Sequence, residues 1–457
     1  MNLAGWQPRL EDLARRHQVP GASLAVLADG EVTALATGVL HTGTGVEATT
    51  DSLFQIGSIS KVYTATVLFG LIDRGLARVD TPVVELLPRF RVADPQVSRQ
   101  VTLRHLLAHT SGINGDFFHD TGRGDDCLAR YVEACAELAQ SHPLSATFSY
   151  CNSGYVILGR VIEALTGMVW DAALAEQLIE PLRLAHTWTL PEDVLRFRAA
   201  MGHLTRSAGD RPQPASSWTL PRSVGPAGLI CATATDVVAF ARLHLDNGHG
   251  PRGTRLLTAT SVAEMQRPQV AVPNPHAMAD HWGLGWALFD WGGRRVLGHD
   301  GGTIGQSAYL RLVPDAGVAV ALLTNSDRAG AFSQELFTAL LGELCDLAVP
   351  APLEPPERPP RVDLRRHVGV YERVGTRLEV RLDHGRLVLE VTPTGPLADL
   401  QPAFDMELVP LTDTLLVGKP AIASQWMPVV FYALPDGSPY LHDGTRATPK
   451  ATGSVSD

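Results

Sequence analysis

The spacing of apolar residues predicts a first region of 349 residues that begins with strands and continues with helices. An amphipathic helix is expected near Trp6–His17, and two strands, Ala22–Ala28 and Glu31–Thr37, follow it. Asp29-Gly30 separates these strands, and an Asp-Gly pair between apolar runs is a strong signal for a hairpin. Helical spacing then dominates the middle of the region, at Lys61–Gly75, Cys127–Ser141, Gly154–Thr166 and Thr235–Leu245.

Strands return at the end of this region and complete its architecture. The predicted elements are strands at Arg294–Gly298, Ala308–Val313 and Gly317–Thr324, and a final helix at Ala331–Leu347. Strands at both ends of a region, with helices between them, indicate one mixed sheet and a separate helical lobe. We therefore expect an α/β (α+β) fold with an active site in the cleft between the sheet and the lobe.

A proline-rich segment separates this region from a smaller one. Pro350–Pro360 reads PAPLEPPERPP, and such a density of proline excludes helix and sheet and favours a stiff, extended linker. After it, apolar and polar residues alternate with a period of two, as in Arg377–Leu382, which is typical of short antiparallel strands. The expected organisation is a large domain at 1–349, a linker at 350–360, a small β sandwich or barrel at 361–450, and a tail at 451–457.

Composition and charge argue against several classes of protein. The 457 residues carry a formal net charge of −10, and no basic face of the kind that binds nucleic acid is evident. No apolar run is long enough to span a membrane, and Met1–Pro20 lacks the apolar core of a secretory signal, so a cytoplasmic protein is expected. The five cysteines form no CxxC pair and the 16 histidines no HExxH motif, which argues against a metal site.

Ser58-Ile59-Ser60-Lys61 is the first motif that carries chemistry. Ser58 and Lys61 are three residues apart at the predicted start of a helix, so their side chains lie one turn apart on the same face. A serine hydroxyl becomes a good nucleophile when a neighbouring base takes its proton, and a buried lysine with a lowered pKa is such a base. The chain has only three lysines, which makes this placement less accidental. The alternative is an exposed lysine beside a capping serine.

Two further motifs each have a structural alternative. Tyr150-Cys151-Asn152 precedes a predicted helix, where a tyrosine can shuttle a proton and an asparagine amide can hold a lysine and a substrate carbonyl. By itself this pattern is more typical of a packed tyrosine beside a turn. His299-Asp300-Gly301-Gly302 follows an apolar strand, and its glycines allow a backbone N–H to form half of an oxyanion hole. The alternative there is a β-bulge with a structural histidine.

Taken in order, these motifs resemble the serine β-lactamase and penicillin-binding-protein superfamily, and in particular its class C-like branch. That branch also contains D-stereospecific peptidases and family VIII-type esterases. The resemblance rests on serine-xx-lysine, then tyrosine-x-asparagine, then a strand with a basic residue-x-glycine. Further segments between Val19 and Leu347 resemble the same branch, namely LRHLLAHTSGI, NSGYVILG, GLICATATDVVAFARL and GLGW.

The resemblance implies a β-lactamase-like transpeptidase fold for residues 1–349 and a role for each motif residue. Ser58 is then the acylated nucleophile and Lys61 its base. Tyr150 relays the proton to the leaving group, and Asn152 positions Lys61 and the substrate amide. The implied chemistry is acyl transfer through an acyl-enzyme, which needs no cofactor and no metal.

The resemblance also assigns the strand that carries the third motif. The backbone N–H groups of Ser58 and Gly302 form the implied oxyanion hole, and Asp300 and Gly301 line the substrate site. His299 takes the place of the lysine in the family's Lys-Thr-Gly strand. Histidine at this position is common in the esterases and peptidases of the branch and less typical of true β-lactamases. Because histidine is largely neutral at pH 7, this position lacks the full charge of a lysine.

Asp300 replaces the hydroxyl residue that usually helps to bind a substrate carboxylate. If it faces the cleft, it repels the carboxylates of penicillins and cell-wall peptides. If it points away, it pairs with an arginine such as Arg294 or Arg295. The first alternative makes the chain poorly suited to either substrate.

The C-terminal domain resembles the small lipocalin-like β-barrel that is attached to some members of the branch and can overhang the active site. One such group is the cytoplasmic penicillin-binding-protein-type thioesterases, which take a peptidyl chain from a nonribosomal synthetase and cyclise it. Arg446 is expected either to reach the cleft and bind a polar end of the substrate or to be a solvated surface residue. The loop Gly115–Asp126 is a candidate for the rim of the cleft.

The leading hypothesis is a serine hydrolase or acyltransferase that acts on esters or on amides with a D-configured acyl part. The first alternative is a thioesterase that macrocyclises nonribosomal peptides, with a peptidyl thioester on a carrier protein as a possible partner. The second alternative is a β-lactamase or DD-peptidase. A further hypothesis is a binding or sensor protein that has the same fold and no catalytic activity. Small-molecule or peptidyl substrates are expected, and neither nucleic acid nor a membrane.

Overall fold

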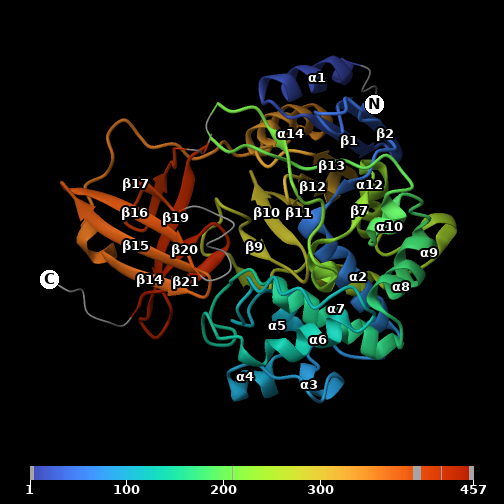
Figure 1. Cartoon of the computed structure of the whole chain (residues 1–457), viewed down its shortest axis with the longest axis horizontal. Helices are drawn as coiled ribbons and strands as arrows, with labels where there is room; N and C mark the ends of the chain where they lie inside the picture. The colour runs from blue at the N-terminus through green and yellow to red at the C-terminus, as the bar shows by residue number, and fades with distance from the viewer. Residues whose placement is uncertain (1–4, 208, 395–402, 422, 424, 452–457) are drawn as a thin grey trace.

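The computed structural model describes residues 5–207, 209–394, 403–421, 423 and 425–451. It shows a large region built on an eight-stranded sheet, with a second eight-stranded sheet beside it near the C-terminus (Figure 1). The strands of the first sheet, in order across it, are β2 (Glu31–Gly38), β1 (Gly21–Ala28), β13 (Val318–Thr324), β12 (Ser307–Val313), β11 (Arg294–Gly302), β10 (Ala287–Trp291), β9 (His281–Trp282) and β8 (Val270–Ala271).

The α+β fold class predicted from the sequence is confirmed, and the sheet differs from the prediction in one respect. The sequence predicts a mixed sheet, whereas every strand pairing that the structure describes in it is antiparallel. The strands from β10 to β13 follow one another through short connections, and a short connection reverses the chain and gives antiparallel neighbours. The first hairpin then joins β13 with Ala22 opposite Thr324.

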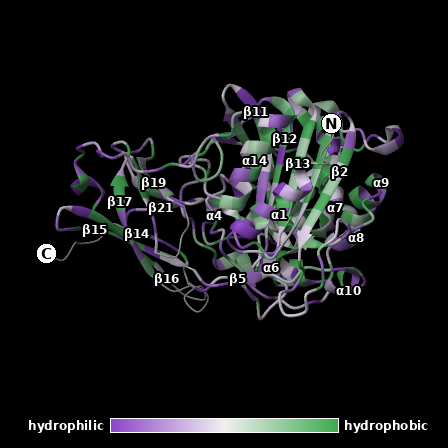
Figure 2. Ribbon diagram, turned by 90° about the horizontal axis from the view of Figure 1, so that it is seen from above, coloured by the Kyte–Doolittle hydropathy of each residue, from purple (hydrophilic) through white to green (hydrophobic). Residues whose placement is uncertain are grey.

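Helices cover both faces of this sheet. On one face, α1 (Trp6–Arg16) and α14 (Gly330–Cys345) bury Leu10, Phe332 and Leu336 against it (Figure 1). All seven residues of β13 are buried, as expected for a central strand between two helical layers. Figure 2 shows hydrophobic residues gathered on the central strands of this region. The opposite face is covered by the helical lobe that carries the Ser-xx-Lys motif.

The helical lobe is formed by the middle of the chain, and α2 (Ser60–Asp73) lies at its centre. Most of the 14 residues of α2 are buried, so this helix presents no continuous polar face to water. The other helices are α3 (Val83–Leu86), α4 (Pro95–Gln100), α5 (Leu103–Leu107), α6 (Cys127–Ala134), α7 (Asn152–Thr166), α8 (Trp170–Leu174), α9 (Glu180–Leu182), α10 (Pro191–Val194), α11 (Gly225–Gly228), α12 (Ala234–Leu245) and α13 (Ala259–Met265). Two small sheets complete the region: a three-stranded sheet of β3 (Phe54–Gln55), β7 (Cys231–Ala232) and β4 (Thr187–Trp188), and a pair of β5 (His203–Leu204) and β6 (Gln213–Pro214).

The predicted helix Cys127–Ser141 is shorter in the structure. It ends as α6 at Ala134, and a 3-10 turn over Cys135–Glu137 leads into extended chain. Ser141 N–H donates to the Gly112 carbonyl over 2.7 Å, so this segment pairs with the chain that precedes the rim loop. A tertiary contact therefore overrides the helical spacing of the sequence.

The C-terminal strands form the predicted small antiparallel barrel. They are β14 (Gly369–Arg373), β15 (Thr376–Asp383), β16 (Arg386–Pro393), β17 (Phe404–Pro410), β18 (Leu415–Gly418), β19 (Met427–Ala433), β20 (Pro439–Asp443) and β21 (Arg446–Pro449), each beside the next. Ala451 N–H donates to the Val370 carbonyl over 2.8 Å, which nearly closes the barrel. Its separate hydrophobic cluster includes Leu378, Leu389 and Phe431. The exact domain boundaries stay a prediction, and the tail lies outside the described residues from position 452 on.

The barrel docks on the segment that leads to Tyr150. Tyr150 N–H donates to the Thr445 carbonyl over 3.0 Å, and Ala447 N–H donates to Ser149 Oγ over 3.2 Å. Tyr440 donates its hydroxyl to the Ser141 carbonyl over 3.3 Å. The turn between β20 and β21 is thereby fixed to the backbone of the second motif.

Within the described residues, the helices are too short or too polar to cross a membrane.

Acid should destabilise the folded state through His442, a fully buried residue of β20 whose ring stacks on Phe148 of the large region. Burial, with a smaller contribution from Arg446, lowers the pKa of His442 to about 3, whereas an unfolded histidine has a pKa near 6.5. Between about pH 6.5 and pH 3, the unfolded chain takes up a proton on this histidine and the folded chain does not. The free energy of unfolding therefore falls, through this group, by up to about 1.4 kcal/mol for each unit by which the pH is lowered. Well above about pH 6.5 the histidine is neutral in both states and does not affect the free energy of unfolding.

We expect His442→Phe to reduce the loss of stability between pH 7 and pH 5 by about 2 kcal/mol, measured by urea unfolding at both values. His384→Asn, at a side chain that is 97% exposed, is the matched control and should leave the loss unchanged. An equal loss in His442→Phe and in the unaltered protein would contradict this account.

Candidate active site

Ser58 and Lys61 meet at the start of the central helix. Ser58 lies in the 3-10 turn η2 (Gly57–Ile59), directly before α2, and Lys61 lies in the first turn of α2. Lys61 Nζ is 2.9 Å from Ser58 Oγ and donates to the Ala227 carbonyl of α11 over 2.7 Å. The lysine is fully buried, so the alternative of an exposed first-turn lysine does not describe this structure.

The surroundings of Lys61 favour its neutral form. Burial lowers the pKa of Lys61 well below its usual value, and the positive charge of Arg446 lowers it further. A neutral amine has a lone pair that can take the proton of the neighbouring hydroxyl. The pair is therefore arranged for nucleophilic attack by Ser58 with Lys61 as general base.

Tyr150 lies against both groups. Its ring centroid is 4.8 Å from Lys61 Nζ, and its hydroxyl is buried without a hydrogen-bond partner among the described residues. Burial raises the pKa of Tyr150, and the nearby Ser58 hydroxyl opposes this rise only in part. The phenol thus keeps its proton and can donate it to a leaving group.

His109 packs against Tyr150 and holds it in place, and this residue lies outside the three motifs identified from the sequence. Its ring lies 4.3 Å from the Tyr150 ring, and its Nδ1 accepts the Cys151 N–H over 2.9 Å. Cys151 in turn caps α7, because its sulfur accepts the Gly154 N–H over 3.2 Å. His109 belongs to the LRHLLAHTSGI segment, so the family resemblance was the one available signal.

Glycines bring β11 close to the nucleophile. A Cβ atom at Gly301 would lie 1.9 Å from the Ile56 carbonyl oxygen, and one at Gly57 would lie 2.6 Å from the Gly302 nitrogen. Gly57 also has a φ of +52°, which disfavours other residues. Because side chains are absent at these positions, the backbones of Ser58 and Gly302 approach each other, as an oxyanion hole of two N–H groups requires.

His299 lies on the cleft side of β11 and is 1% exposed. Its ring centroid is 6.1 Å from that of Tyr150 and 5.3 Å from that of Trp282. Burial, and to a lesser extent the charge of Lys61, lowers the pKa of His299 to about 3. The imidazole is therefore neutral where the resembled family carries a charged lysine.

Asp300 points away from the cleft and pairs with an arginine, which is the second of the two alternatives expected from the sequence, but the arginine is a different one from those suggested. Its carboxylate accepts a hydrogen bond from each terminal nitrogen of Arg311 on β12, one of them over 3.1 Å. Arg294, suggested by the sequence, pairs instead with Asp315. Successive residues of a strand point to opposite faces, so Asp300 lies behind the sheet when His299 faces the cleft. The expectation that Asp300 binds substrate is therefore not supported.

Asn152 begins α7 and is partly exposed. In the described part of the chain, its side chain makes no hydrogen bond with Lys61, whose amine is held by Ala227 instead. The Ala227 carbonyl, and not Asn152, therefore positions the Lys61 amine. The side-chain amide of Asn152 remains available to bind a polar group of the substrate.

Arg446 reaches the site from the barrel. Its guanidinium lies 5.1 Å from the Tyr150 ring centroid and forms a two-point ion pair with Asp116, at 3.1 Å and 2.5 Å. The two side chains are 12% and 14% exposed, so Arg446 is not a solvated surface residue. Asp116 comes from the predicted rim loop, and the sequence offered no signal for this partnership.

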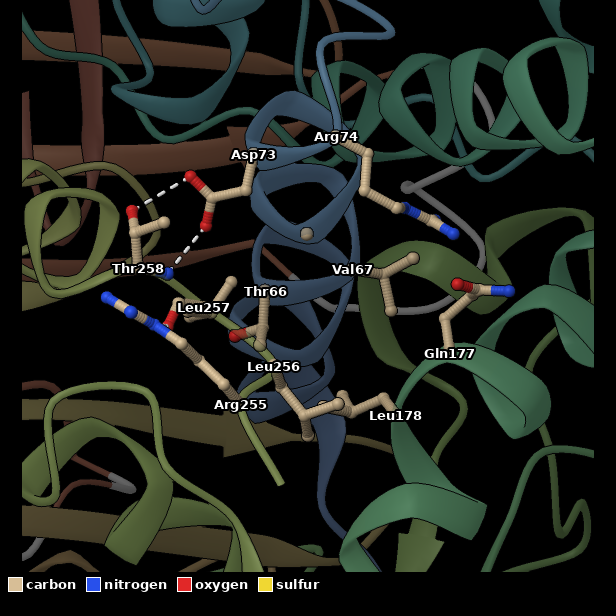
Figure 3. Close-up of a pocket in the computed structure, with 11 residues that line it drawn as sticks. Thr66, Val67, Asp73, Arg74, Gln177, Leu178, Arg255, Leu256, Leu257 and Thr258 are labelled. Atoms are coloured by element: carbon tan, nitrogen blue, oxygen red, sulfur yellow. Dashed lines mark hydrogen bonds between the residues drawn. The ribbon is translucent and has the colours of Figure 1, made fainter. Parts of the chain in front are cut away.

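The cavity drawn in Figure 3, of about 290 Å³, is separate from these residues. It lies along α2 away from the motif, and Thr258 binds Asp73 there. The side chains of Arg74 and Arg255 extend to different sides of the helix (Figure 3), so they do not form a shared anion site. In the described residues, no three histidine, cysteine or acidic side chains gather as a metal site would require.

Comparisons with known proteins find a family model, curated relatives and solved structures similar to this chain. The family model described as Beta-lactamase matches residues 6–343. Penicillin-binding protein 4 of Amycolatopsis lactamdurans is 54% identical over 375 residues, which are 81% of this chain and 98% of that protein. The crystal structure of SurE has a TM-score of 0.80 at 30% identity, over 98% of both chains, and the structure of SurE with D-Leu has a TM-score of 0.76. A D-stereospecific amidohydrolase from Streptomyces sp. has a TM-score of 0.59 at 26% identity, over 76% of this chain and 100% of that one.

The ion pair between Arg446 and Asp116 should set the pH dependence of the nucleophile. Arg446 lowers the pKa of Lys61, and Asp116 raises it. Acylation of Ser58 needs the neutral amine, so its rate rises as pH passes the pKa of Lys61. Arg446→Met should therefore move this rise to higher pH, and Asp116→Asn should move it to lower pH.

The measurement is the rate at which an activated acyl ester modifies Ser58, followed by intact-protein mass against pH. The double variant removes both charges and should lie between the single variants. Shifts of the two single variants in the same direction would show that the pair acts on the fold and not on the lysine charge.

Proposed function

The chain belongs to the Beta-lactamase family and is a serine hydrolase of that family, and we propose that it cleaves esters or amides with a D-configured acyl residue through an acyl-Ser58 intermediate. The observation that carries this proposal is the buried Lys61 amine 2.9 Å from Ser58 Oγ. A buried amine in hydrogen-bond contact with a hydroxyl is the arrangement that nucleophilic catalysis needs.

In the proposed reaction, Lys61 takes the Ser58 proton while Oγ attacks the substrate carbonyl. The N–H groups of Ser58 and Gly302 stabilise the oxyanion that forms. Tyr150 passes the proton to the leaving group as the acyl-enzyme is produced, and the Asn152 amide holds the substrate. Water or an amine then enters by the reverse sequence and releases the acyl group.

Preference for a D-configured acyl residue is supported by the neighbours. SurE was solved with D-Leu, and another structural neighbour is a D-stereospecific amidohydrolase. SurE matches this chain over the catalytic region and the barrel together, at 98% of both chains. The macrocyclising thioesterase is the second candidate, in which an amine of the same peptide replaces water, because the sequence resemblance attributes a barrel of this kind to that group. A peptidyl thioester on a carrier protein would be its substrate.

A β-lactamase or DD-peptidase remains the third candidate, favoured by the name of the penicillin-binding relative. Asp300 does not repel the carboxylate of such a substrate, because its ion pair with Arg311 holds it out of the cleft. His299 still disfavours this candidate, since a neutral imidazole gives a substrate carboxylate no charge to pair with. The cation nearest to Tyr150 on the barrel side, Arg446, is already paired with Asp116.

The test is to supply a peptidyl thioester ending in a D-residue and its L-epimer, and to read the products by mass spectrometry. We expect an acyl adduct on Ser58 and turnover of the D-epimer, with a loss on the order of 10³-fold or more in Ser58→Ala and in Lys61→Met. Lys450→Met, at a lysine outside the site, is the matched control.

A cyclic product would favour the thioesterase candidate, and a linear acid alone would favour the general hydrolase. Absence of any adduct on Ser58 with both epimers and with benzylpenicillin would overturn the proposed mechanism.

A further inference from the structure

The Nε2 atom of His299 is a buried polar atom without a hydrogen-bond partner in the described residues. The other ring nitrogen, Nδ1, lies 2.7 Å from the Asp300 carbonyl oxygen. A carbonyl oxygen can only accept a hydrogen bond, so Nδ1 carries the proton of the neutral ring. Nε2 therefore presents a lone pair, and this atom is an obligatory acceptor.

The neighbours of His299 do not satisfy this lone pair. Tyr150 Oη and Trp282 Nε1 are the polar groups of the rings packed around it, and each is itself buried without a partner in the part of the chain that the structure describes. Lys61 Nζ is engaged by Ser58 and Ala227. A buried acceptor left unpaired costs free energy, so a substrate group that donates there gains by its binding.

The position of His299 shows which part of a substrate meets it. It precedes Gly302 by three residues on β11, beside the nucleophile turn and facing Tyr150. The group that Tyr150 serves in the proposed reaction is the amine that enters or leaves. An anion at this position would meet the lone pair of Nε2 and be repelled, whereas an N–H group would be held.

We propose that His299 Nε2 accepts a hydrogen bond from the acyl acceptor and selects primary amines. This inference rests on the proposed function. A primary amine attacks the acyl-Ser58 carbonyl with its lone pair; the C–N bond forms and the bond from carbon to Ser58 Oγ breaks. One amine proton passes through Tyr150 and Lys61 to Ser58 Oγ. The second N–H stays on the nitrogen of the amide product and is the hydrogen that His299 holds throughout.

A secondary amine has one N–H, which it must give up, and none remains for His299. The two classes of amine therefore differ in the contact that His299 makes. The test lets benzylamine and N-methylbenzylamine compete for one acyl-Ser58, formed from an N-acyl-D-amino acid thioester. The ratio of the two amide products is read by mass spectrometry, and differences in the rate of acylation cancel from it.

We expect His299→Phe, which has no acceptor, to lower the ratio of primary to secondary amide by roughly 3- to 10-fold. His299→Gln places an amide oxygen near the position of Nε2 and should keep most of the ratio. If the phenylalanine variant does not fold, His299→Lys replaces it, because an ammonium donates but cannot accept and should lower the ratio likewise.

An unchanged ratio in the folded acceptor-free variant would overturn the proposal. So would an acyl-Ser58 that hydrolyses but yields no amide with either amine, and in that case the hydrolase function would stand. If no acyl-Ser58 forms, the proposed function fails and the inference fails with it. Measuring the adduct on Ser58 before the amines are added separates these outcomes.

Discussion

Removing the Lys61 amine from water costs free energy unless polar groups surround it, and separate parts of the fold supply those groups. The turn before α2 contributes Ser58, and α11 contributes the Ala227 carbonyl. Close packing at Gly57 and Gly301 then brings the edge of β11 against the same turn. Once the amine is enclosed in this way, its pKa falls, and the hydroxyl beside it gains a base.

The C-terminal barrel contributes directly to the environment of Tyr150 and Lys61. Its β20–β21 turn hydrogen-bonds the Tyr150 backbone, and it places Arg446 over the ring of the same tyrosine. Tyr150 thus lies close to both the Lys61 amine and the Arg446 guanidinium, at 4.8 Å and 5.1 Å from its ring centroid. Asp116 offsets the charge of Arg446, so that a pair from two regions of the chain sets the field in which the lysine titrates.

The sequence predicted what depends on local spacing and missed what depends on distant contacts. Ser58 and Lys61 are one helical turn apart, so their meeting could be read from the chain. The pairing of Asp300 with Arg311 depends on the register between β11 and β12, which no sequence pattern specifies. The two partners suggested from the sequence, Arg294 and Arg295, were therefore wrong. For the same reason, the motifs did not identify the groups that the tertiary fold brings to the site, namely His109, Asp116 and Ala227.

The protonation state of the buried Lys61 amine can be measured directly because the chain has three lysines. Protein labelled with ¹³C at lysine Cε gives three signals to follow against pH by nuclear magnetic resonance, and loss of one in Lys61→Met assigns it. We expect this signal to titrate well below the value of about 10.4 for a free lysine. A Lys61 signal that titrates at that ordinary value would contradict the account.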